Sequence, residues 1–287
     1  MRHWRRLRPA STFLTTVWLL SAAAAILAGT VGYGYFEAIS RPLVRRATIR
    51  LAGWPDGVRP VTVALISDLH VQPPDMKPKR VASIVEQIDS LSPDVILLAG
   101  DFLGSGPLAT NPAQGIKSLA PLRGLRARFG TFAVLGNHDG EGREVTRALT
   151  SAGITVLRNE AASAGPLVVG GVDDVLSQRD NLPLTLSKMR RLSGAKVLLA
   201  HSPDFFAQLP KDIGLTLAGH THCGQVVIPL VGPIFTGSDY GRRFYCGVTQ
   251  ENGRTLIVTA GVGTSFLPIR IGAAPDMWLI RIGPAPR

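Results

Sequence analysis

The chain has 287 residues, of which 45% are hydrophobic and 18% charged, so it can bury a substantial core and is not an intrinsically disordered protein. Its formal net charge is +11, but residues 1 to 50 alone carry +7, from eight arginines and one glutamate. Nucleic-acid-binding proteins concentrate positive charge on the domain that reads the nucleic acid, so we do not expect nucleic acid as a partner.

An uncharged segment covers residues 11 to 36 and is long enough, as a helix, to cross the hydrocarbon core of a bilayer. Tyr33, Tyr35 and Phe36 suit the membrane interface at its end. We expect a transmembrane anchor here, after a basic N-terminal arm at residues 1 to 10. A cleaved signal peptide is the alternative, because small residues at 21 to 25 and Ala28 offer cleavage positions. The apolar run continues past them, which favours the anchor.

The orientation of this anchor follows from charge only weakly, because four arginines lie on each side of the segment. The arginine-rich arm favours a cytoplasmic N-terminus, and hence a single-pass protein of the cell (inner) membrane with an extracytoplasmic catalytic domain. Cys223 and Cys246 leave the orientation open, since a disulfide between them would require an oxidising compartment.

A juxtamembrane connector is expected at residues 37 to 57, with a short strand at 47 to 51, and a single domain at 58 to 287. In this domain five apolar runs each stop at a polar residue able to bind metal. Continuous apolar runs of this length are typical of strands that are buried on both faces. The runs are VTVALISDLH (61 to 70), DVILLAGD (94 to 101), TFAVLGNHD (131 to 139), KVLLAH (196 to 201) and LTLAGHTH (215 to 222).

Segments between these runs have apolar residues at helical spacing, which predicts helices at 78 to 92, 142 to 153 and 182 to 193. Strand and helix therefore alternate, which predicts an α/β sheet with its polar residues at the carboxyl ends of the strands. From about residue 225 the runs QVVIP, RFYCGVTQ, TLIVTAG and MWLIRIG are joined by turns rich in Gly and Pro. These predict a second, antiparallel or mixed sheet packed on the first.

Histidine is concentrated at the ends of the five runs, together with Asp68, Asp101 and Asn137. Several buried His and Asp side chains that converge without an ion would be electrostatically costly, so the pattern predicts a metal centre. The spacings Asp-x-His and His-x-His let one tight turn present two ligands. The histidines concerned are five of the six in the chain: His70, His138, His201, His220 and His222.

The ordered set of motifs resembles the signature of the calcineurin-like metallophosphoesterases, over roughly residues 58 to 283, and within them the small bacterial membrane-associated branch. The resemblance implies an α/β fold, a four-layer α/β/β/α sandwich. The motifs are Asp68-x-His70, Gly100-Asp101, Gly136-Asn137-His138-Asp139, His201 and Gly219-His220-x-His222.

The resemblance also implies two divalent metal ions and a set of ligands. Mixed nitrogen and oxygen ligands suit Mn, Fe or Zn better than Mg. Two such ions would activate a bridging water or hydroxide for in-line attack on phosphorus. Asp68, His70 and His222 would hold the first ion, Asn137, His201 and His220 the second, and Asp101 would bridge both.

His138 is the expected catalytic residue, as a proton donor to the leaving group. Many phosphatases of this superfamily orient that histidine with an Asp in the second motif, where this sequence has Gly104 and Ser105. Asp139 could substitute only if local geometry allows, and a role in packing or in supporting the site fits it better.

Further charged residues near the motifs admit two interpretations each. Arg242, Arg243 and Arg270 could receive a phosphate group, although arginines on loops are usually solvated. Asp173 and Asp174 could approach the cleft or belong to an ordinary turn.

The sequence thus predicts a membrane-anchored, dinuclear metal-dependent phosphoesterase that hydrolyses phosphomonoester or phosphodiester bonds. A lipid-linked pyrophosphatase, such as a UDP-diacylglucosamine hydrolase, is the alternative within the same chemistry, since an anchor would hold it beside an amphipathic substrate. A non-catalytic metal-binding scaffold protein is the alternative from another class. The complete ligand set and His138 argue against the scaffold. These patterns select neither the substrate nor the oligomeric state.

Overall fold

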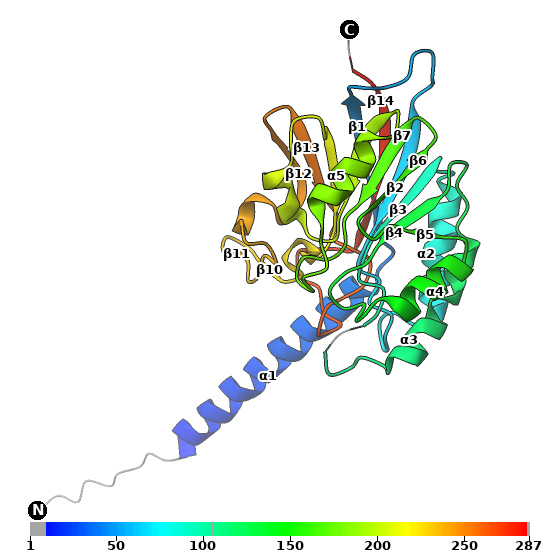
Figure 1. Cartoon of the computed structure of the whole chain (residues 1–287). Helices are drawn as coiled ribbons and strands as arrows, with labels where there is room; N and C mark the ends of the chain where they lie inside the picture. The colour runs from blue at the N-terminus through cyan, green and yellow to red at the C-terminus, as the bar shows by residue number, and fades with distance from the viewer. Residues whose placement is uncertain (1–9, 105, 286–287) are drawn as a thin grey trace, which may run out of the picture.

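A computed structural model of the chain describes residues 10–104 and 106–285. Its domain consists of two six-stranded mixed sheets that lie face to face, with helices on the two outer faces (Figure 1). The predicted α/β sandwich with four layers is therefore confirmed. Residues 1–9 of the expected basic arm, and Ser105, lie outside the described residues.

The first sheet has the strand order β1-β14-β2-β3-β4-β5. Strands β2 to β5 run parallel, as expected of strands joined by helical crossovers, and β14 inserts antiparallel to β2. The strands are β1 (Leu43–Leu51), β2 (Val61–Ile66), β3 (Val95–Ala99), β4 (Thr131–Val134), β5 (Thr155–Val156) and β14 (Asp276–Pro284).

The second sheet has the order β12-β13-β9-β8-β7-β6, and β10 (Val227–Ile228) pairs with β11 (Gly232–Pro233) in a separate hairpin. The five apolar runs are all strands, but they are divided: β2, β3 and β4 lie in the first sheet, β8 and β9 in the second. The strands are β6 (Glu160–Ala164), β7 (Leu167–Gly171), β8 (Ala195–Leu199), β9 (Leu215–Ala218), β12 (Gly247–Glu251) and β13 (Arg254–Val258).

Helices α2, α3 and α4 cover the outer face of the first sheet, and α5 covers that of the second (Figure 1). In α2 the apolar residues Val81, Ile84, Val85 and Ile88 are buried, which is the stripe that helical spacing predicts. The helices are α2 (Pro78–Ser90), α3 (Pro112–Ser118), α4 (Arg143–Ser151) and α5 (Leu182–Arg190), with short 3-10 turns η1 (Ala120–Gly124), η2 (Pro203–Gln208), η3 (His222–Gly224) and η4 (Gly241–Arg243).

The apolar N-terminal segment is a single long helix, α1 (Ala10–Ala38), which extends away from the domain (Figure 1). Residues 13 to 38 have the length and hydropathy of a membrane span, a test that a signal sequence also passes. The end of α1 packs against the domain, where the Arg270 amide donates a hydrogen bond of 2.9 Å to the Gly34 carbonyl. Part of the segment expected as a connector forms β1, which pairs in parallel with β14.

Candidate metal centre

The polar residues that end the five apolar runs come together where the two sheets meet. Each lies two to four residues after the last residue of its strand, so the carboxyl ends of β2, β3, β4, β8 and β9 form one site. From the first sheet come Asp68, His70, Asp101, Asn137 and His138, and from the second sheet come His201, His220 and His222.

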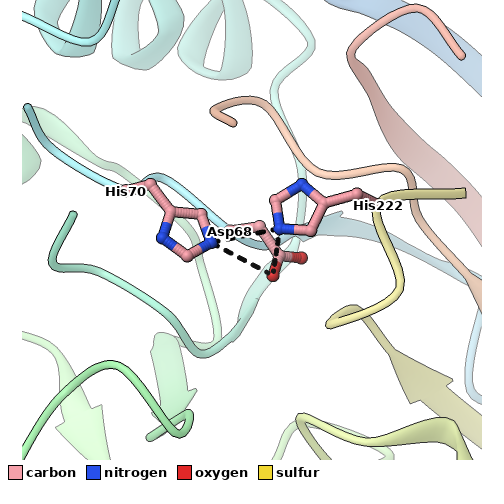
Figure 2. A group of neighbouring side chains, drawn as sticks. All are labelled: Asp68, His70 and His222. Atoms are coloured by element: carbon pink, nitrogen blue, oxygen red, sulfur yellow. Dashed lines mark hydrogen bonds and ion pairs between the residues drawn. The ribbon is translucent and has the colours of Figure 1, made fainter. Parts of the chain in front are cut away.

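Asp68, His70 and His222 form a first buried group whose ligand atoms all lie within 4.8 Å of one another. Figure 2 shows both imidazoles turned toward the Asp68 carboxylate. The Nε2 atoms of His70 and His222 are 3.1 Å apart, and Asp68 Oδ1 lies 3.5 Å from His222 Nε2. Two nitrogens bound tetrahedrally to one metal at about 2.0–2.1 Å would be about 3.4 Å apart, so this group has the size of a metal site.

A second group has the same compactness and consists of Asp101, His201 and His220. His201 Nε2 lies 3.2 Å from His220 Nδ1. Asn137 joins this group, since its Oδ1 atom lies 3.1 Å from His201 Nε2. The side chains predicted as ligands are therefore assembled into two adjacent groups, as a dinuclear centre requires.

Asp101 lies between the two groups. Its Oδ2 atom is 3.4 Å from His70 Nε2, in the first group, and 3.2 Å from His201 Nε2, in the second. One carboxylate oxygen thus faces both groups.

Hydrogen bonds from the outer ring nitrogens fix how two of the imidazoles face the centre. His70 Nδ1 lies 3.1 Å from the Leu103 carbonyl oxygen, and His201 Nδ1 lies 2.7 Å from that of Ala99. Because a carbonyl only accepts, each Nδ1 carries the proton and donates it, which leaves the Nε2 lone pair directed at the centre.

Two of the imidazoles have electrostatics that suit metal ligation, while His201 and Asp68 would have to release a proton when a metal binds. Burial lowers the pKa of His70 to about 4 and that of His220 to about 3, so both rings are neutral at pH 7, as metal-binding imidazoles must be. Burial raises the pKa of Asp68 to about 7. Burial would also raise the pKa of Asp101, but the neighbouring imidazoles, His201 first, hold it well below its ordinary value. That carboxylate overcomes the burial of His201 and raises its pKa to about 10.

Several predicted ligands have left-handed φ angles, and glycines beside them leave space for the neighbouring side chains. Left-handed φ angles are uncommon for residues other than glycine, and they gather at functional sites. A side chain at Gly136 would collide with the Asp101 carboxylate, and one at Gly219 with Ser67, so these motif glycines provide space. The predicted ligands with positive φ are Asp68, His70, Asp101, His220 and His222.

Asp139 holds the loops of the first sheet together. Its buried carboxylate accepts backbone hydrogen bonds from Asp101 (3.1 Å), Phe102 (2.8 Å), Leu103 (3.2 Å) and Gly136 (2.9 Å). Both oxygens are thereby engaged in fixing the turns after β3 and β4, so Asp139 supports the site and does not orient the neighbouring histidine.

His138 lines the cavity above the two groups, with its side chain 29% exposed. Among the described residues, Asp101 provides the one carboxylate within 4.0 Å of its ring nitrogens, at 4.0 Å from Nε2. A side chain at Gly104 would lie 2.5 Å from Gln72 Oε1. The buried Gln72 therefore occupies the space that an orienting carboxylate at position 104 would need.

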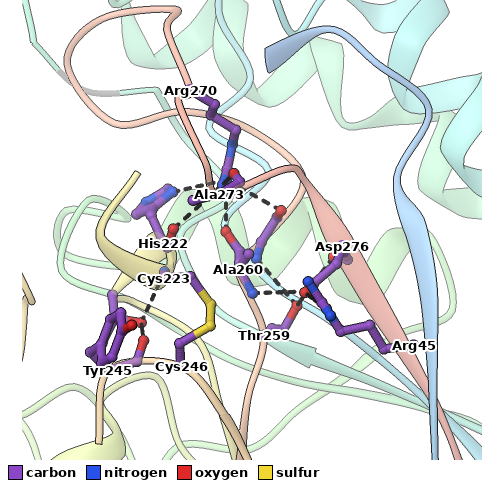
Figure 3. Close-up of a disulfide and its surroundings, with 12 residues drawn as sticks. Arg45, His222, Cys223, Tyr245, Cys246, Thr259, Ala260, Arg270, Ala273 and Asp276 are labelled. Carbon is purple, nitrogen blue, oxygen red and sulfur yellow. Dashed lines mark hydrogen bonds and ion pairs between the residues drawn. A yellow bond between two sulfur atoms is a disulfide. The ribbon is translucent and has the colours of Figure 1, made fainter. Parts of the chain in front are cut away.

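A disulfide between Cys223 and Cys246 supports the turn that carries the last two histidines (Figure 3). It joins residues 23 apart in sequence, with their Cα atoms 4.7 Å apart. Thr221 Oγ1 adds a hydrogen bond of 2.6 Å to the Tyr245 carbonyl in the same segment.

Arg270 is wholly buried behind His222 (Figure 3). Its guanidinium donates hydrogen bonds to the carbonyls of Ala260 (2.6 Å), Gly263 (2.6 Å) and Ala273 (2.8 Å). It is therefore neither solvated nor available to a phosphate, and the interpretation of Arg270 as a substrate residue is wrong. The sequence alone does not reveal this burial.

The other charged residues singled out in the sequence also have partners away from the metal groups. Arg243 pairs with Glu251, and Arg242 donates to the Val231 carbonyl. Asp173 pairs with Arg158, and Asp174 accepts a hydrogen bond from the Ser177 amide, as in an ordinary turn.

A cavity of about 700 Å³ opens beside the metal groups. One side is polar and includes His138, while Leu176, Ile234, Phe235 and Phe266 make the other side apolar. The sequence motifs do not predict this apolar wall. Its signal is the apolar stretch IPLVGPIF (228 to 235), which is more hydrophobic than a turn rich in Gly and Pro requires.

Two mixed sheets that present two His/Asp metal-binding groups at their strand ends define a metal-dependent phosphoric ester hydrolase. The chain belongs to this class: the family model described as calcineurin-like phosphoesterase matches residues 61–224. The chain is 31% identical over 281 residues to the uncharacterized metallophosphoesterase YkuE of Bacillus subtilis, covering 92% of this chain and 94% of the relative. It is 32% identical over 279 residues to the phosphodiesterase YaeI of Escherichia coli, covering 92% and 97%.

Proposed function

We propose that this metallophosphoesterase hydrolyses phosphodiester or phosphomonoester bonds at a dinuclear centre. The observation that carries the proposal is the placement of Asp101 Oδ2, 3.4 Å from His70 Nε2 and 3.2 Å from His201 Nε2. We assign Asp68, His70 and His222 to the first ion, Asn137, His201 and His220 to the second, and Asp101 to both.

The reaction adds water across the phosphoester: the hydroxyl goes to phosphorus, the bond to the leaving oxygen breaks, and that oxygen receives a proton. When bound, two divalent ions supply the Lewis acidity that activates the water and neutralises the phosphoryl oxygens. His138, on the wall of the cavity, donates the proton to the leaving oxygen. Asp139 keeps the Asp101 loop in place through its backbone hydrogen bonds. The nucleophile is water and not a side chain. Mn, Fe or Zn suits the mixed donor set.

We also propose that residues 11–36 anchor the chain in the cell membrane, with the arm at 1–10 in the cytoplasm and the catalytic domain (58–287) outside. The disulfide supports this orientation, because disulfides persist in oxidising compartments. In this arrangement the connector (37–57) also contributes β1 to the first sheet. Membrane fractionation followed by intact-mass analysis tests the anchor, and a mature protein that starts near residue 25 to 30 contradicts it.

The activity is tested on the full chain, because truncation after the connector would remove β1 from the sheet. Elemental analysis of the purified protein should find about two metal ions per chain. Turnover of the soluble diester bis(p-nitrophenyl) phosphate should require added Mn after chelation. Full activity in metal-free protein would contradict the mechanism, and two bound metals without turnover of any ester would favour a metal-binding scaffold.

A further inference from the structure

Large apolar side chains are exposed on two loops beside the mouth of the cavity. Phe235 is 75% exposed and Phe266 60% exposed, although both also line the cavity. Single exposed apolar residues are normal, but a contiguous group indicates an interaction surface. We call this group the apolar rim, and it consists of Leu230, Val231, Ile234, Phe235, Phe266 and Leu267.

The backbone of the apolar rim makes these side chains harder to explain by folding alone. Leu230, at the tip of the β10–β11 hairpin, has φ 66°, and Phe266 has φ 61°. Bulky residues rarely adopt left-handed φ, and Gly or Asn would form the same turns more readily. Each loop therefore carries a large apolar side chain that is exposed to solvent at a position where local conformation disfavours it.

The two loops lie side by side and adjoin the end of α1. The Val227 amide donates to the Ile271 carbonyl (2.8 Å), and the Ile271 amide donates to the Gln225 carbonyl (2.9 Å). One residue earlier in the second loop, Arg270 is hydrogen-bonded to Gly34 of α1. Figure 1 shows that α1 leaves the domain at the end where β10 and β11 lie. The apolar rim and the root of α1 thus belong to one end of the molecule.

With α1 as the proposed membrane span, this end of the domain lies at the bilayer surface. Residues 13 to 30 are exposed along the whole helix, whereas Gly34 and Ala38 are buried against the domain. At a rise of about 1.5 Å per residue, the exposed part is about 27 Å long, close to the hydrocarbon thickness of about 30 Å. No spacer separates the span from the domain, so Tyr33 and Phe36 fall at the interface, as aromatic residues near a membrane do.

We propose that the apolar rim docks on the lipid bilayer, and that the substrate is a phosphoester carried by a lipid whose apolar chain lies along the Phe235 and Phe266 wall of the cavity. This inference rests on the proposed function and on α1 as a membrane span. The same end of the domain carries the membrane helix, the apolar rim and the mouth of the cavity, so a lipid-borne ester can reach the metal groups without leaving the bilayer surface.

The docking is tested with the full chain in nanodiscs of phosphatidylcholine and phosphatidylglycerol. The two native cysteines are paired, so a single introduced cysteine can be spin-labelled selectively. A label at Leu230→Cys should be protected from a water-soluble nickel chelate and accessible to oxygen. A label at Leu184→Cys, an exposed position on α5, should show the reverse. Equal access of the chelate to both labels would overturn the docking.

The substrate class is tested with two probes that share one leaving group. These are dioleoylphosphatidyl-p-nitrophenol in the nanodisc, which water cleaves to phosphatidic acid and nitrophenol, and soluble bis(p-nitrophenyl) phosphate. Leu230→Asn and Phe266→Asn keep a residue that accepts left-handed backbone. Each should lower the ratio of lipid-borne to soluble turnover by at least about tenfold, since each removes apolar contact with lipid. Leu184→Asn should leave the ratio as in the wild type.

The outcomes separate this inference from the proposed function. An unchanged ratio in both rim variants overturns the inference while soluble turnover upholds the phosphoesterase. If the metal-loaded wild type turns over neither of the two probes, the proposed function itself is contradicted. If Leu230→Asn instead converts a dimer into a monomer in detergent, the apolar rim is a contact between two copies and the bilayer docking is wrong.

Discussion

The two sheets contribute unequal chemistry to the metal centre. The first sheet supplies both carboxylates of the metal-binding groups, Asp68 and Asp101, and the second supplies imidazoles only. Each group nevertheless combines ligands from both sheets, since His222 joins Asp68 while His201 and His220 join Asp101. Neither sheet holds a complete group, so both groups are assembled only when the sheets are packed against each other.

The supports of the two halves differ as well. On the first sheet, backbone amides donate to the buried Asp139 carboxylate, which fixes the turns after β3 and β4. On the second sheet, the turn with His222 is held by the disulfide at Cys223 and by the buried Arg270, which contacts the His222 carbonyl and Nδ1. The first half is therefore fixed by hydrogen bonds alone, whereas the second half has a covalent link in addition to its hydrogen bonds.

Asp101→Asn should have the largest effect, because the Asp101 carboxylate lies within 3.4 Å of an imidazole nitrogen of each group. Loss of its charge should weaken the binding of both ions and lower turnover of bis(p-nitrophenyl) phosphate by more than about 10,000-fold, several kcal/mol of transition-state stabilisation. Metal content by elemental analysis and kcat/KM are measured together. Excess Mn should restore little, and a variant with two metals and near-normal activity would remove Asp101 from the bridging position.

His138→Ala changes the first-sheet half without removing a ligand. Metal content should stay near that of the wild type, while turnover of an ester with a poor leaving group falls by roughly 100-fold to 10,000-fold, the usual scale for general acid catalysis. The loss should be smaller for nitrophenyl esters, whose leaving oxygen needs little protonation. Because no carboxylate at position 104 orients the ring, we expect the low end of this range. Loss of a metal, or equal losses for both leaving groups, would contradict the role of proton donor.

Sequence patterns predict the buried strands and the polar residues that follow them, because each of these features is visible in a short local stretch of sequence. The runs before Asp68, Asp101 and His201 are apolar because these strands are buried on both faces, and each run ends where its polar residue enters the site. The patterns do not show that β8 and β9 belong to the second sheet, because parallel strands of either sheet have the same sequence character.

The missed features depend on contacts between distant segments. Arg270 looks like a loop arginine in the sequence, and only the convergence of three carbonyls around it makes it a buried structural residue. β14 joins the first sheet because it pairs with β1 and β2, more than 200 residues earlier in the chain. The motif GDFLGSG lacks an Asp at position 104, but the space taken by Gln72 is visible only in the structure.

A double substitution, Cys223→Ser with Cys246→Ser, tests the covalent support of the second-sheet half. Removal of a link that closes a loop of this length should lower the free energy of unfolding by about 2–4 kcal/mol, chiefly by relaxing the constraint on the unfolded chain. Denaturant unfolding of the metal-loaded full chain gives this value. Reduced wild type should behave like the double variant, and with excess Mn both should keep most of their activity. Equal stability of oxidised wild type and variant would mean that the disulfide does not support this turn.

Arg243→Gln should have the smallest effect, and it tests whether an arginine near the second-sheet half binds the phosphoryl group. Arg243 lies in the short η4 turn and pairs with Glu251 through two hydrogen bonds, of 2.8 and 2.6 Å. The pair is exposed, and exposed ion pairs contribute little to stability. We expect kcat/KM for the soluble diester to stay within roughly twofold of the wild-type value. The dependence of kcat/KM on salt concentration should also be that of the wild type.

Glu251→Gln provides the matched control for Arg243→Gln, because it breaks the same ion pair but leaves the arginine free. If the arginine contributes only to this pair, the two variants should have the same kinetics. If Arg243→Gln raised KM at least tenfold while Glu251→Gln did not, the arginine would reach the substrate during turnover. Phosphate recognition would then extend beyond the metal groups and His138, and the second-sheet half would supply a cation as well as its imidazoles.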